Sequence, residues 1–286
     1  MRTIAHISDI HFGKVDSQVA DALVEEINGR SPTLLVISGD LTQRARAGQY
    51  KQAAAFLERF NAPRLVVPGN HDVPLFNVVR RFFWPLARYR QHITPELRPM
   101  FRDDEMLVLG INTSRSFTWS LHGFWKDGGI SEEQLLDVKL KACQVPADVL
   151  KIVVTHHPFI SPPGERVHGI VHEAPRALAT FEQCGIDIVL AGHLHMGYSG
   201  DVRTHHEATK RSILSIQAGT ATSTRRRGEP NAYNWLELDL NQATIEVRAW
   251  SGRAFTTAAT TRFIRTEAVW RQASMPPSAV APVRLR

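Results

Sequence analysis

The chain of 286 residues has little cysteine and no long apolar run. Its two cysteines, Cys143 and Cys184, lie far apart in the sequence and predict no disulfide. So few thiols fit a reduced, cytoplasmic setting. No stretch approaches the roughly 18 consecutive apolar residues of a membrane-spanning helix, and the first residues lack the pattern of a signal peptide. These absences together predict a cytoplasmic protein without a membrane span.

Positive charge exceeds negative charge, with 34 Lys and Arg against 28 Asp and Glu and a formal net charge of +6. Such an excess favours anionic partners, including phosphate esters, nucleic acid and acidic lipid. The densest basic cluster is Arg225–Arg227, which is shorter than the runs of roughly five to eight residues typical of nucleic-acid patches. We interpret it as a solvated loop, with a substrate clamp as the alternative. The charge pattern therefore argues against a nucleic-acid partner.

Five short apolar runs, rich in β-branched residues, each end at side chains that bind metals. Runs of this kind, separated by helical stretches, predict buried strands of an α/β protein. The loops after the carboxyl ends of such strands converge on one crevice. Residues two apart in an extended strand end also point the same way, so alternation is expected to pair the polar residues within a run. The polar residues at the five ends are Asp9 and His11, Asp40, Asn70 with His71 and Asp72, His156 with His157, and His193 with His195.

These donors are oxygen and imidazole nitrogen atoms without a thiolate, because both cysteines lie outside the five endings. Such a set suits Mn, Fe, Zn or Co, and does not distinguish among them. The sequence therefore predicts a site for divalent or trivalent metal ions at one edge of the fold.

The order and spacing of the motifs resemble the calcineurin-like metallophosphoesterase superfamily, from about Met1 to Trp250. The motifs are Asp9-x-His11, Gly39-Asp40, Gly69-Asn70-His71-Asp72, His156 and Gly192-His193-x-His195. Further residues are similar to the bacterial class III cyclic-nucleotide phosphodiesterase branch, namely Leu41 and Thr42, Gly48, Tyr50, Gly129–Ser131, Gln134 and Leu135. The second Asp of the protein-phosphatase branch is absent after Asp40, which argues against a phosphoprotein substrate.

The resemblance implies an α/β fold in which a two-sheet β-sandwich is flanked by helices, with two bound metal ions. It implies that Asp9, His11, Asp40 and His195 hold one ion, and that Asp40, Asn70, His156 and His193 hold the other. A hydroxide bridging the ions would attack phosphorus. His71 would protonate the leaving alkoxide, or alternatively only position the phosphate. Asp72 is expected to cap the following turn, and His157 to pack beside the site or to support a ligand from behind.

An insertion at about 74–105 separates the third and fourth motifs. From Leu75 to Ile93 the apolar residues follow helical spacing, and Pro85 should kink or divide the helix. Arginines interleave with aromatic residues there. The segment is a cap over the metal site, an interfacial helix on anionic lipid, or a helix packed on the sandwich, which we favour. For a second aromatic cluster at 117–125 the alternatives are stacking on a base, lining an apolar pocket, or anchoring the loop to the core.

We expect one domain at 1–265 and a proline-containing tail at 266–286 that is disordered or contacts another subunit of a homo-oligomer. Strands near 212–216, 234–240 and 244–250 should complete the second sheet. The predicted function is hydrolysis of small phosphodiesters, with cyclic nucleotides as the leading substrates. The alternatives are a pyrophosphatase or phosphodiesterase acting on lipid-linked or glycerophospho substrates, a phosphomonoesterase, and a metal-free binding scaffold.

Overall fold

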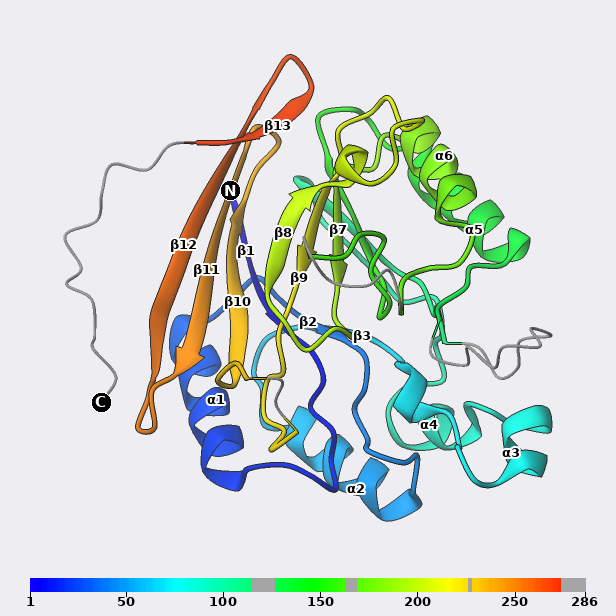
Figure 1. The fold of residues 1–286 in the computed structure, drawn as a ribbon, viewed down its shortest axis with the longest axis vertical. Helices are drawn as coiled ribbons and strands as arrows, with labels where there is room; N and C mark the ends of the chain where they lie inside the picture. Colours follow the sequence, from blue (N-terminus) through cyan, green and yellow to red (C-terminus); the bar gives the residue numbers. More distant parts are fainter. Residues whose placement is uncertain (115–126, 163–168, 226–227, 274–286) are drawn as a thin grey trace.

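The computed structural model of the chain describes residues 1–114, 127–162, 169–225 and 228–273, which form two mixed β-sheets flanked by helices (Figure 1). In the first sheet β1, β2 and β3 are parallel and β10 pairs antiparallel with β1. Its strands, in spatial order, are β13 (Val269–Gln272), β12 (Phe255–Thr266), β11 (Gln242–Trp250), β10 (Ala232–Leu238), β1 (Arg2–Ile7), β2 (Leu34–Ser38) and β3 (Arg64–Val67). The strands of the second, in spatial order, are β4 (Met100–Arg102), β5 (Met106–Gly110), β6 (Leu150–Val154), β7 (Ile188–Ala191), β9 (Leu214–Gln217) and β8 (Tyr198–Asp201).

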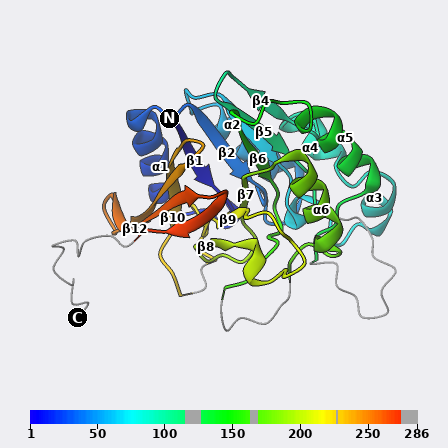
Figure 2. The same cartoon turned by 90° about the horizontal axis from the view of Figure 1, so that it is seen from above.

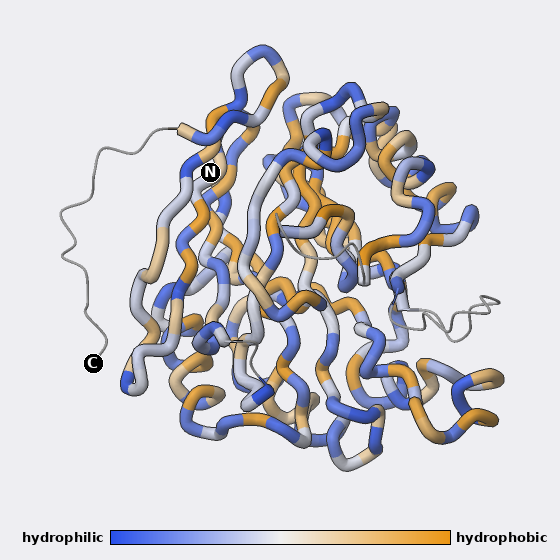
Figure 3. The backbone as a smooth tube through the Cα atoms, viewed as in Figure 1, coloured by the Kyte–Doolittle hydropathy of each residue, from blue (hydrophilic) through white to orange (hydrophobic). Residues whose placement is uncertain are grey.

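The central strands β2, β5 and β6 read as near-continuous apolar runs because both of their faces are covered. Along β2, Leu34 and Val36 face the other sheet, whereas Leu35 and Ile37 face helices. The cluster between the sheets contains residues of both, such as Ile152 of β6. Hydrophobic stretches run along the strands in the middle of the fold, whereas the strands at the side of the first sheet that includes β12 alternate with hydrophilic residues (Figure 3). The predicted two-sheet sandwich is confirmed.

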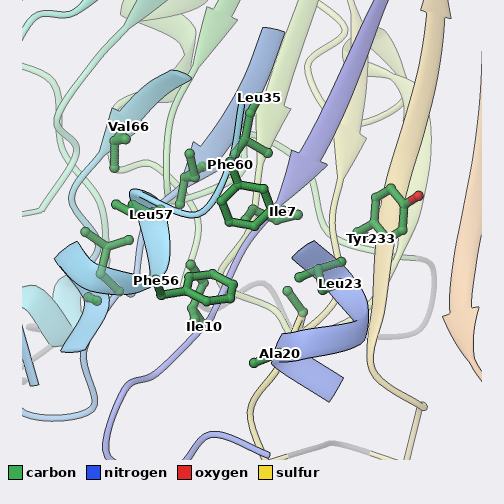
Figure 4. Close-up of a cluster of buried hydrophobic side chains, with 14 of the residues drawn as sticks. Ile7, Ile10, Ala20, Leu23, Leu35, Phe56, Leu57, Phe60, Val66 and Tyr233 are labelled. Atoms are coloured by element: carbon green, nitrogen blue, oxygen red, sulfur yellow. The ribbon is translucent and has the colours of Figure 1, made fainter. Parts of the chain in front are cut away.

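Helices cover the outer face of each sheet (Figure 2). The helices α1 (Ser17–Arg30) and α2 (Ala47–Leu57) pack on the first sheet, where Leu23 and Phe56 meet Ile7 (Figure 4). The helices α5 (Glu132–Ala142) and α6 (Ala174–Cys184) pack on the second. Two short 3₁₀ turns occur at Asn70–Asp72 and Val202–Thr204.

The segment 129–135, which resembles the cyclic-nucleotide branch, begins helix α5. Ser131 is its N-cap and accepts a hydrogen bond from the Gln134 backbone N–H, while the Gln134 side chain accepts one from the Ser131 N–H. This reciprocal pair satisfies two backbone donors at the start of the helix. The side-chain amide of Gln134 also donates to the Asn112 carbonyl, and Leu135 is buried. These contacts explain the segment as a helix start.

Two of the late strands extend the first sheet, so the prediction that all three complete the second sheet is wrong. The segment predicted at 212–216 does join the second sheet as β9. The segments at 234–240 and 244–250 form β10 and β11, because β10 pairs along the free edge of β1 and covers its unpaired backbone groups.

The last hairpin also extends beyond residue 266, where the tail was predicted to begin. Val269–Gln272 pair with β12, and Trp270 is only 3% exposed. The Trp270 indole N–H donates to the Asp187 carbonyl, and Arg265 forms an ion pair with the Asp187 carboxylate. The sheet therefore continues to Gln272, and the rest of the predicted tail, at 274–286, lies outside the described residues.

Cys143 and Cys184 form a disulfide, so the prediction of unpaired cysteines is wrong. The reason is topological. The connections β5–α5–β6 and β6–α6–β7 join parallel neighbouring strands, so α5 and α6 lie side by side in the same direction and their carboxyl ends meet (Figure 1). The cytoplasmic prediction rested partly on free thiols and loses that support. Across the described ranges, no helix is both long enough and apolar enough to cross a membrane.

The predicted division of the insertion at Pro85 is confirmed, with α3 (Val78–Phe83) before it and α4 (Ala87–His92) after it. The buried Tyr89 holds α4 on the fold by donating from its hydroxyl to the Val66 carbonyl. Helix α3 has no buried residue. The interpretation as a helix packed on the sandwich therefore holds for α4 and is wrong for α3. Within the predicted insertion, β4 belongs to the second sheet.

Candidate metal centre

The predicted ligands lie in loops just beyond the carboxyl ends of five strands. Their backbone is not the extended strand end that alternation would require. Five of these residues have left-handed backbone, with φ of 54° at Asp9, 54° at His11, 53° at Asp40, 73° at His193 and 61° at His195. The alternation argument is therefore wrong, and turns in left-handed conformation bring the side chains together instead. Such backbone is costly for residues with a Cβ, and it clusters at functional sites.

A first group of donors contains Asp9, His11 and His195, whose nearest ligand atoms lie within 4.8 Å of one another. His11 Nε2 lies 3.5 Å and His195 Nε2 lies 3.6 Å from Asp9 Oδ1. His11 Nε2 also lies 3.7 Å from Asp40 Oδ2. All four side chains are buried.

A second group surrounds His156. Its Nε2 lies 3.0 Å from Asn70 Oδ1, 3.1 Å from His193 Nδ1 and 3.4 Å from Asp40 Oδ1. Asp40 thus turns one carboxylate oxygen toward each group. A single carboxylate with two oxygens is suited to bridging two ions.

Burial opposes charge on Asp9 and Asp40, but the neighbouring histidines outweigh it and hold the pKa of both carboxyl groups below their usual range. Burial likewise opposes protonation of His156, yet Asp40 raises its pKa to about 9. Burial, assisted by His156, lowers the pKa of His193 to about 3. Protons on histidine therefore balance part of the negative charge in the metal-free protein. Metal binding would replace these protons.

Two buried atoms support occupancy by metal. Asp9 Oδ1 and His11 Nε2 make no hydrogen bond within the described part of the chain. Leaving buried polar atoms unsatisfied costs free energy, which a bound cation would recover. The mixture of carboxylate, amide and imidazole donors fits first-row transition ions. The residues present therefore fit two ions, with Asp40 between them.

Neighbouring groups orient the ligands. His156 Nδ1 lies 2.8 Å from the Ser38 carbonyl, which can only accept, so Nδ1 carries the proton and Nε2 is available to a metal. His195 Nδ1 lies 2.6 Å from Thr220 Oγ1. Such outer contacts set the tautomer and the orientation of metal-binding imidazoles.

His71 lies beside the ligands. Its backbone N–H donates to Asp40 Oδ1, and its Nδ1 lies 2.9 Å from the Gln43 carbonyl. Burial lowers the pKa of His71, against the raising effect of Asp40. The ring nitrogen Nε2 lies 3.2 Å from the guanidinium of Arg225. Because Arg225 only donates, Nε2 accepts this hydrogen bond and the imidazole is neutral.

Arg225 is therefore more than part of a solvated loop. Its loop is tied to the segment after β1, since the Thr224 N–H donates to the Lys14 carbonyl and the Asp16 N–H to the Thr222 carbonyl. The side chain is exposed at the mouth of the site. The run of arginines in the sequence pointed to Arg225 but did not indicate its partner. Arg226, Arg227 and the aromatic cluster at 117–125 lie outside the described residues.

Asp72 joins two loops, and the prediction that it caps the following turn is wrong. Its buried carboxylate accepts backbone hydrogen bonds from Gly69, Leu41 and Thr42 and a further one from the Thr42 hydroxyl. Burial and the nearby Asp40 raise the pKa of Asp72 to about 6. The Tyr50 hydroxyl donates to the Asp72 carbonyl. These contacts hold the loop that carries Asp40 against the loop that carries Asn70.

His157 was expected to pack beside the site or to support a ligand from behind. One of its nitrogen atoms forms a group with His156 and His193 whose ligand atoms lie within 4.8 Å of one another. Its Nδ1 lies 2.8 Å from the buried Thr113 hydroxyl. The adjacency of two histidines at one strand end was the available signal, but it did not say which of them faces the site.

Together, the helix-flanked sandwich and the paired donor groups define an α/β protein with a candidate dinuclear metal centre. A family model described as calcineurin-like phosphoesterase matches residues 2–197. The chain belongs to the calcineurin-like phosphoesterase family. The resemblance inferred from the motifs is thereby confirmed at the family level, and it supports a metal-dependent phosphoric ester hydrolase.

Two curated relatives match short segments. Glycerophosphodiester phosphodiesterase GpdQ of Enterobacter lignolyticus is 36% identical over 80 residues, which cover 24% of this chain and 29% of the relative. A probable cyclic nucleotide phosphodiesterase of a Synechococcus species is 32% identical over 81 residues, which cover 25% of this chain and 32% of the relative. The matched segments thus span about a third of each relative's length.

Solved structures of low identity share the fold. Purple acid phosphatase PPD1 of yellow lupin (Lupinus luteus) aligns with a TM-score of 0.63 at 11% identity, covering 91% of this chain and 53% of that chain. A dimetal phosphatase from Danio rerio aligns with a TM-score of 0.62 at 13% identity, covering 87% of this chain and 96% of that chain. These likenesses concern the fold alone.

Proposed function

We propose that the chain is a dinuclear metal-dependent phosphodiesterase. Asp9, His11, Asp40 and His195 would hold one ion, and Asp40, Asn70, His156 and His193 the other. The observation that carries the proposal is the position of Asp40, whose Oδ2 lies 3.7 Å from His11 and whose Oδ1 lies 3.4 Å from His156. Two ions when bound supply positive charge opposite the phosphoryl oxygens and a water molecule of lowered pKa.

The chain's own residues would hold the substrate and move a proton. Arg225 stands at the mouth of the site with its guanidinium beside His71 Nε2. An arginine at this position suits a phosphoryl oxygen, because charge-assisted hydrogen bonds are among the strongest. When Arg225 turns to the phosphate, His71 Nε2 would be free to take up a proton from solvent and, as the imidazolium, to donate it to the leaving oxygen. The Gln43 carbonyl keeps the other ring nitrogen protonated and so orients the ring.

Cyclic nucleotides are the leading substrates in this proposal, supported by the motifs shared with that branch and by one relative's name. Glycerophosphodiesters are the second candidate, supported by the name of the other relative. Both contain a phosphodiester whose hydrolysis expels an alkoxide, so a general acid at His71 serves either one.

The first experiment compares initial rates on bis-p-nitrophenyl phosphate and p-nitrophenyl phosphate after reconstitution with manganese, with a chelator control. Faster, chelator-sensitive cleavage of the diester supports the proposal. Faster cleavage of the monoester would make the chain a phosphomonoesterase. Absence of turnover with any of Mn, Fe, Zn and Co, together with absence of bound metal, would favour the metal-free scaffold.

The role of His71 is tested with leaving groups of different acidity. His71→Ala should impair cleavage of an alkyl phosphodiester far more than cleavage of a p-nitrophenyl phosphodiester, because p-nitrophenolate leaves without a proton. Equal losses on both substrates would reduce His71 to a residue that positions phosphate. Asn70→Ala serves as the comparison, since loss of a metal ligand should impair both substrates together.

A further inference from the structure

Helix α3 exposes a concentration of large apolar side chains. In the preceding turn, Phe76 is 70% exposed. The helix and the residue that follows it expose Val78 by 71%, Val79 by 62%, Phe82 by 60%, Phe83 by 64% and Trp84 by 61%. The hydrophobic stretch lies at the lower right of Figure 3. Soluble surfaces rarely gather such residues in one place, and where they do the patch marks an interaction site. We call these six residues the α3 patch.

Positive charge surrounds the α3 patch. No Asp or Glu occurs between Val73 and Pro95, whereas the same stretch contains four arginines. Arg80 and Arg90 are exposed. A further arginine, Arg44, lies 4.9 Å from the centre of the Phe76 ring. The segment that carries the patch therefore combines apolar rings with cations and contains no carboxylate of its own.

The patch is carried on an anchored support. Tyr89 of α4 is fully buried, and Leu86 is 7% exposed. The half-buried Arg88 donates to the Ala45 carbonyl at 2.8 Å, which ties α4 to the loop before α2. Helix α3 projects beyond α4 on the side away from both sheets (Figure 1). Its apolar side chains are thus held outward and stay more than half exposed.

Two partners suit exposed apolar rings. In a two-fold contact between copies, the same patch meets itself, so the arginines of one copy would face those of the other. An anionic lipid surface has the opposite charge. It accepts aromatic rings at the boundary between headgroups and acyl chains while arginines pair with phosphates. The charge pattern therefore favours lipid over a second copy.

We propose that the α3 patch docks on the surface of an anionic membrane, with Phe82, Phe83 and Trp84 entering the interface and Arg80 and Arg90 contacting lipid phosphates. The chain would then bind the membrane peripherally. The patch begins four residues after Asp72, so docking would hold the metal centre near the lipid surface. This inference concerns binding and does not depend on the proposed phosphodiesterase activity.

Co-sedimentation with vesicles tests the proposal. One vesicle set contains phosphatidylcholine alone and the other contains phosphatidylcholine with phosphatidylglycerol. The test variant is Phe82→Ser with Trp84→Ser. The matched control is Leu136→Ser with Leu140→Ser, because these residues are 55% and 70% exposed and their helix, α5, also contains acidic residues. Circular dichroism and thermal unfolding establish that each variant is folded.

We expect the unaltered protein and the α5 control to bind the anionic vesicles, and the α3 variant to bind them at least about tenfold more weakly. Binding should weaken with salt, since surface attraction is screened. Failure of the unaltered protein to sediment with anionic vesicles would overturn the proposal, as would equal binding by the α3 variant. Sedimentation velocity measures self-association and so tests the alternative, a contact between copies. Loss of self-association in the α3 variant without loss of vesicle binding would identify a contact between copies.

Discussion

Gly69→Ala should disrupt the metal centre without touching a ligand. Gly69 lies directly before Asn70, with φ of −104°, a conformation open to alanine. A Cβ added there would lie 2.1 Å from Asp40 Oδ1 and 2.3 Å from the Asp40 backbone nitrogen. Carbon atoms in favourable contact lie about 3.5–4.0 Å apart. Asp40 or the Gly69 backbone would therefore have to move by roughly 1 Å or more, given those contact distances.

That displacement is large for a metal site. Ligand distances are held to within about 0.2 Å in well-formed sites. A misplacement of about 1 Å costs on the order of a hundredfold in rate. Asp40 also accepts the His71 backbone N–H, so the proton donor would move with the ligand. We expect Gly69→Ala to lower kcat/KM on bis-p-nitrophenyl phosphate about a hundredfold and to reduce bound manganese.

The assay compares metal content after dialysis, kcat/KM and the thermal midpoint of the metal-free protein. Gly48→Ala is the control, because a Cβ at Gly48 would meet nothing within 4 Å. Gly48 lies inside α2, where alanine favours the helix by about 1 kcal/mol, so this variant should keep its activity and gain slightly in stability. If folded Gly69→Ala bound two manganese ions and stayed within threefold of the unaltered kcat/KM, the assignment of Asp40 as the shared ligand would be refuted.

Three further predictions use other parts of the chain. Burial lowers the pKa of His6 from its ordinary value of 6.5 to about 3, so the unfolded chain takes up a proton as pH falls below 6.5 while the folded chain does not. The free energy of unfolding should then fall by up to about 1.4 kcal/mol per pH unit below 6.5. In urea unfolding of the metal-free protein, this free energy should decline less steeply with falling pH for His6→Gln than for the unaltered chain. Parallel declines would contradict the assignment. Arg225→Gln should raise KM for the diester by on the order of tenfold, consistent with loss of a charge-assisted hydrogen bond, without lowering the thermal midpoint; an unchanged KM would exclude substrate contact. Replacing Cys143 and Cys184 by serine should lower the free energy of unfolding by about 4 kcal/mol, because the disulfide closes a loop with a sequence separation of 41 residues. Equal urea midpoints for the double variant and the oxidised protein would show that the disulfide does not stabilise the fold.

The sequence was sufficient for the buried strands and for the type of site. Leu34 to Ser38 reads as a fully buried strand because both faces are covered, and burial is a local requirement on residue type. Likewise, Asp40 after that strand could be predicted to meet His156, because parallel strands deliver their carboxyl ends to a common edge. Pro85 predicted the division of the insertion into two helices, because proline removes a backbone donor from a helix.

Other properties depended on which segments become neighbours. The pairing of β10 with β1 and the disulfide between α5 and α6 join residues far apart in the sequence, and no local pattern specifies such partners. The left-handed turns at Asp9 and His11 are imposed by surrounding contacts against the local preference of the backbone. The spacing of apolar residues in the insertion predicts a helix, but it does not distinguish a helix whose aromatic rings are covered from one whose rings are exposed. The sequence by itself therefore determined which residues require burial or can bind metal, whereas the tertiary structure decided which of them meet, because contact depends on the packing of distant segments.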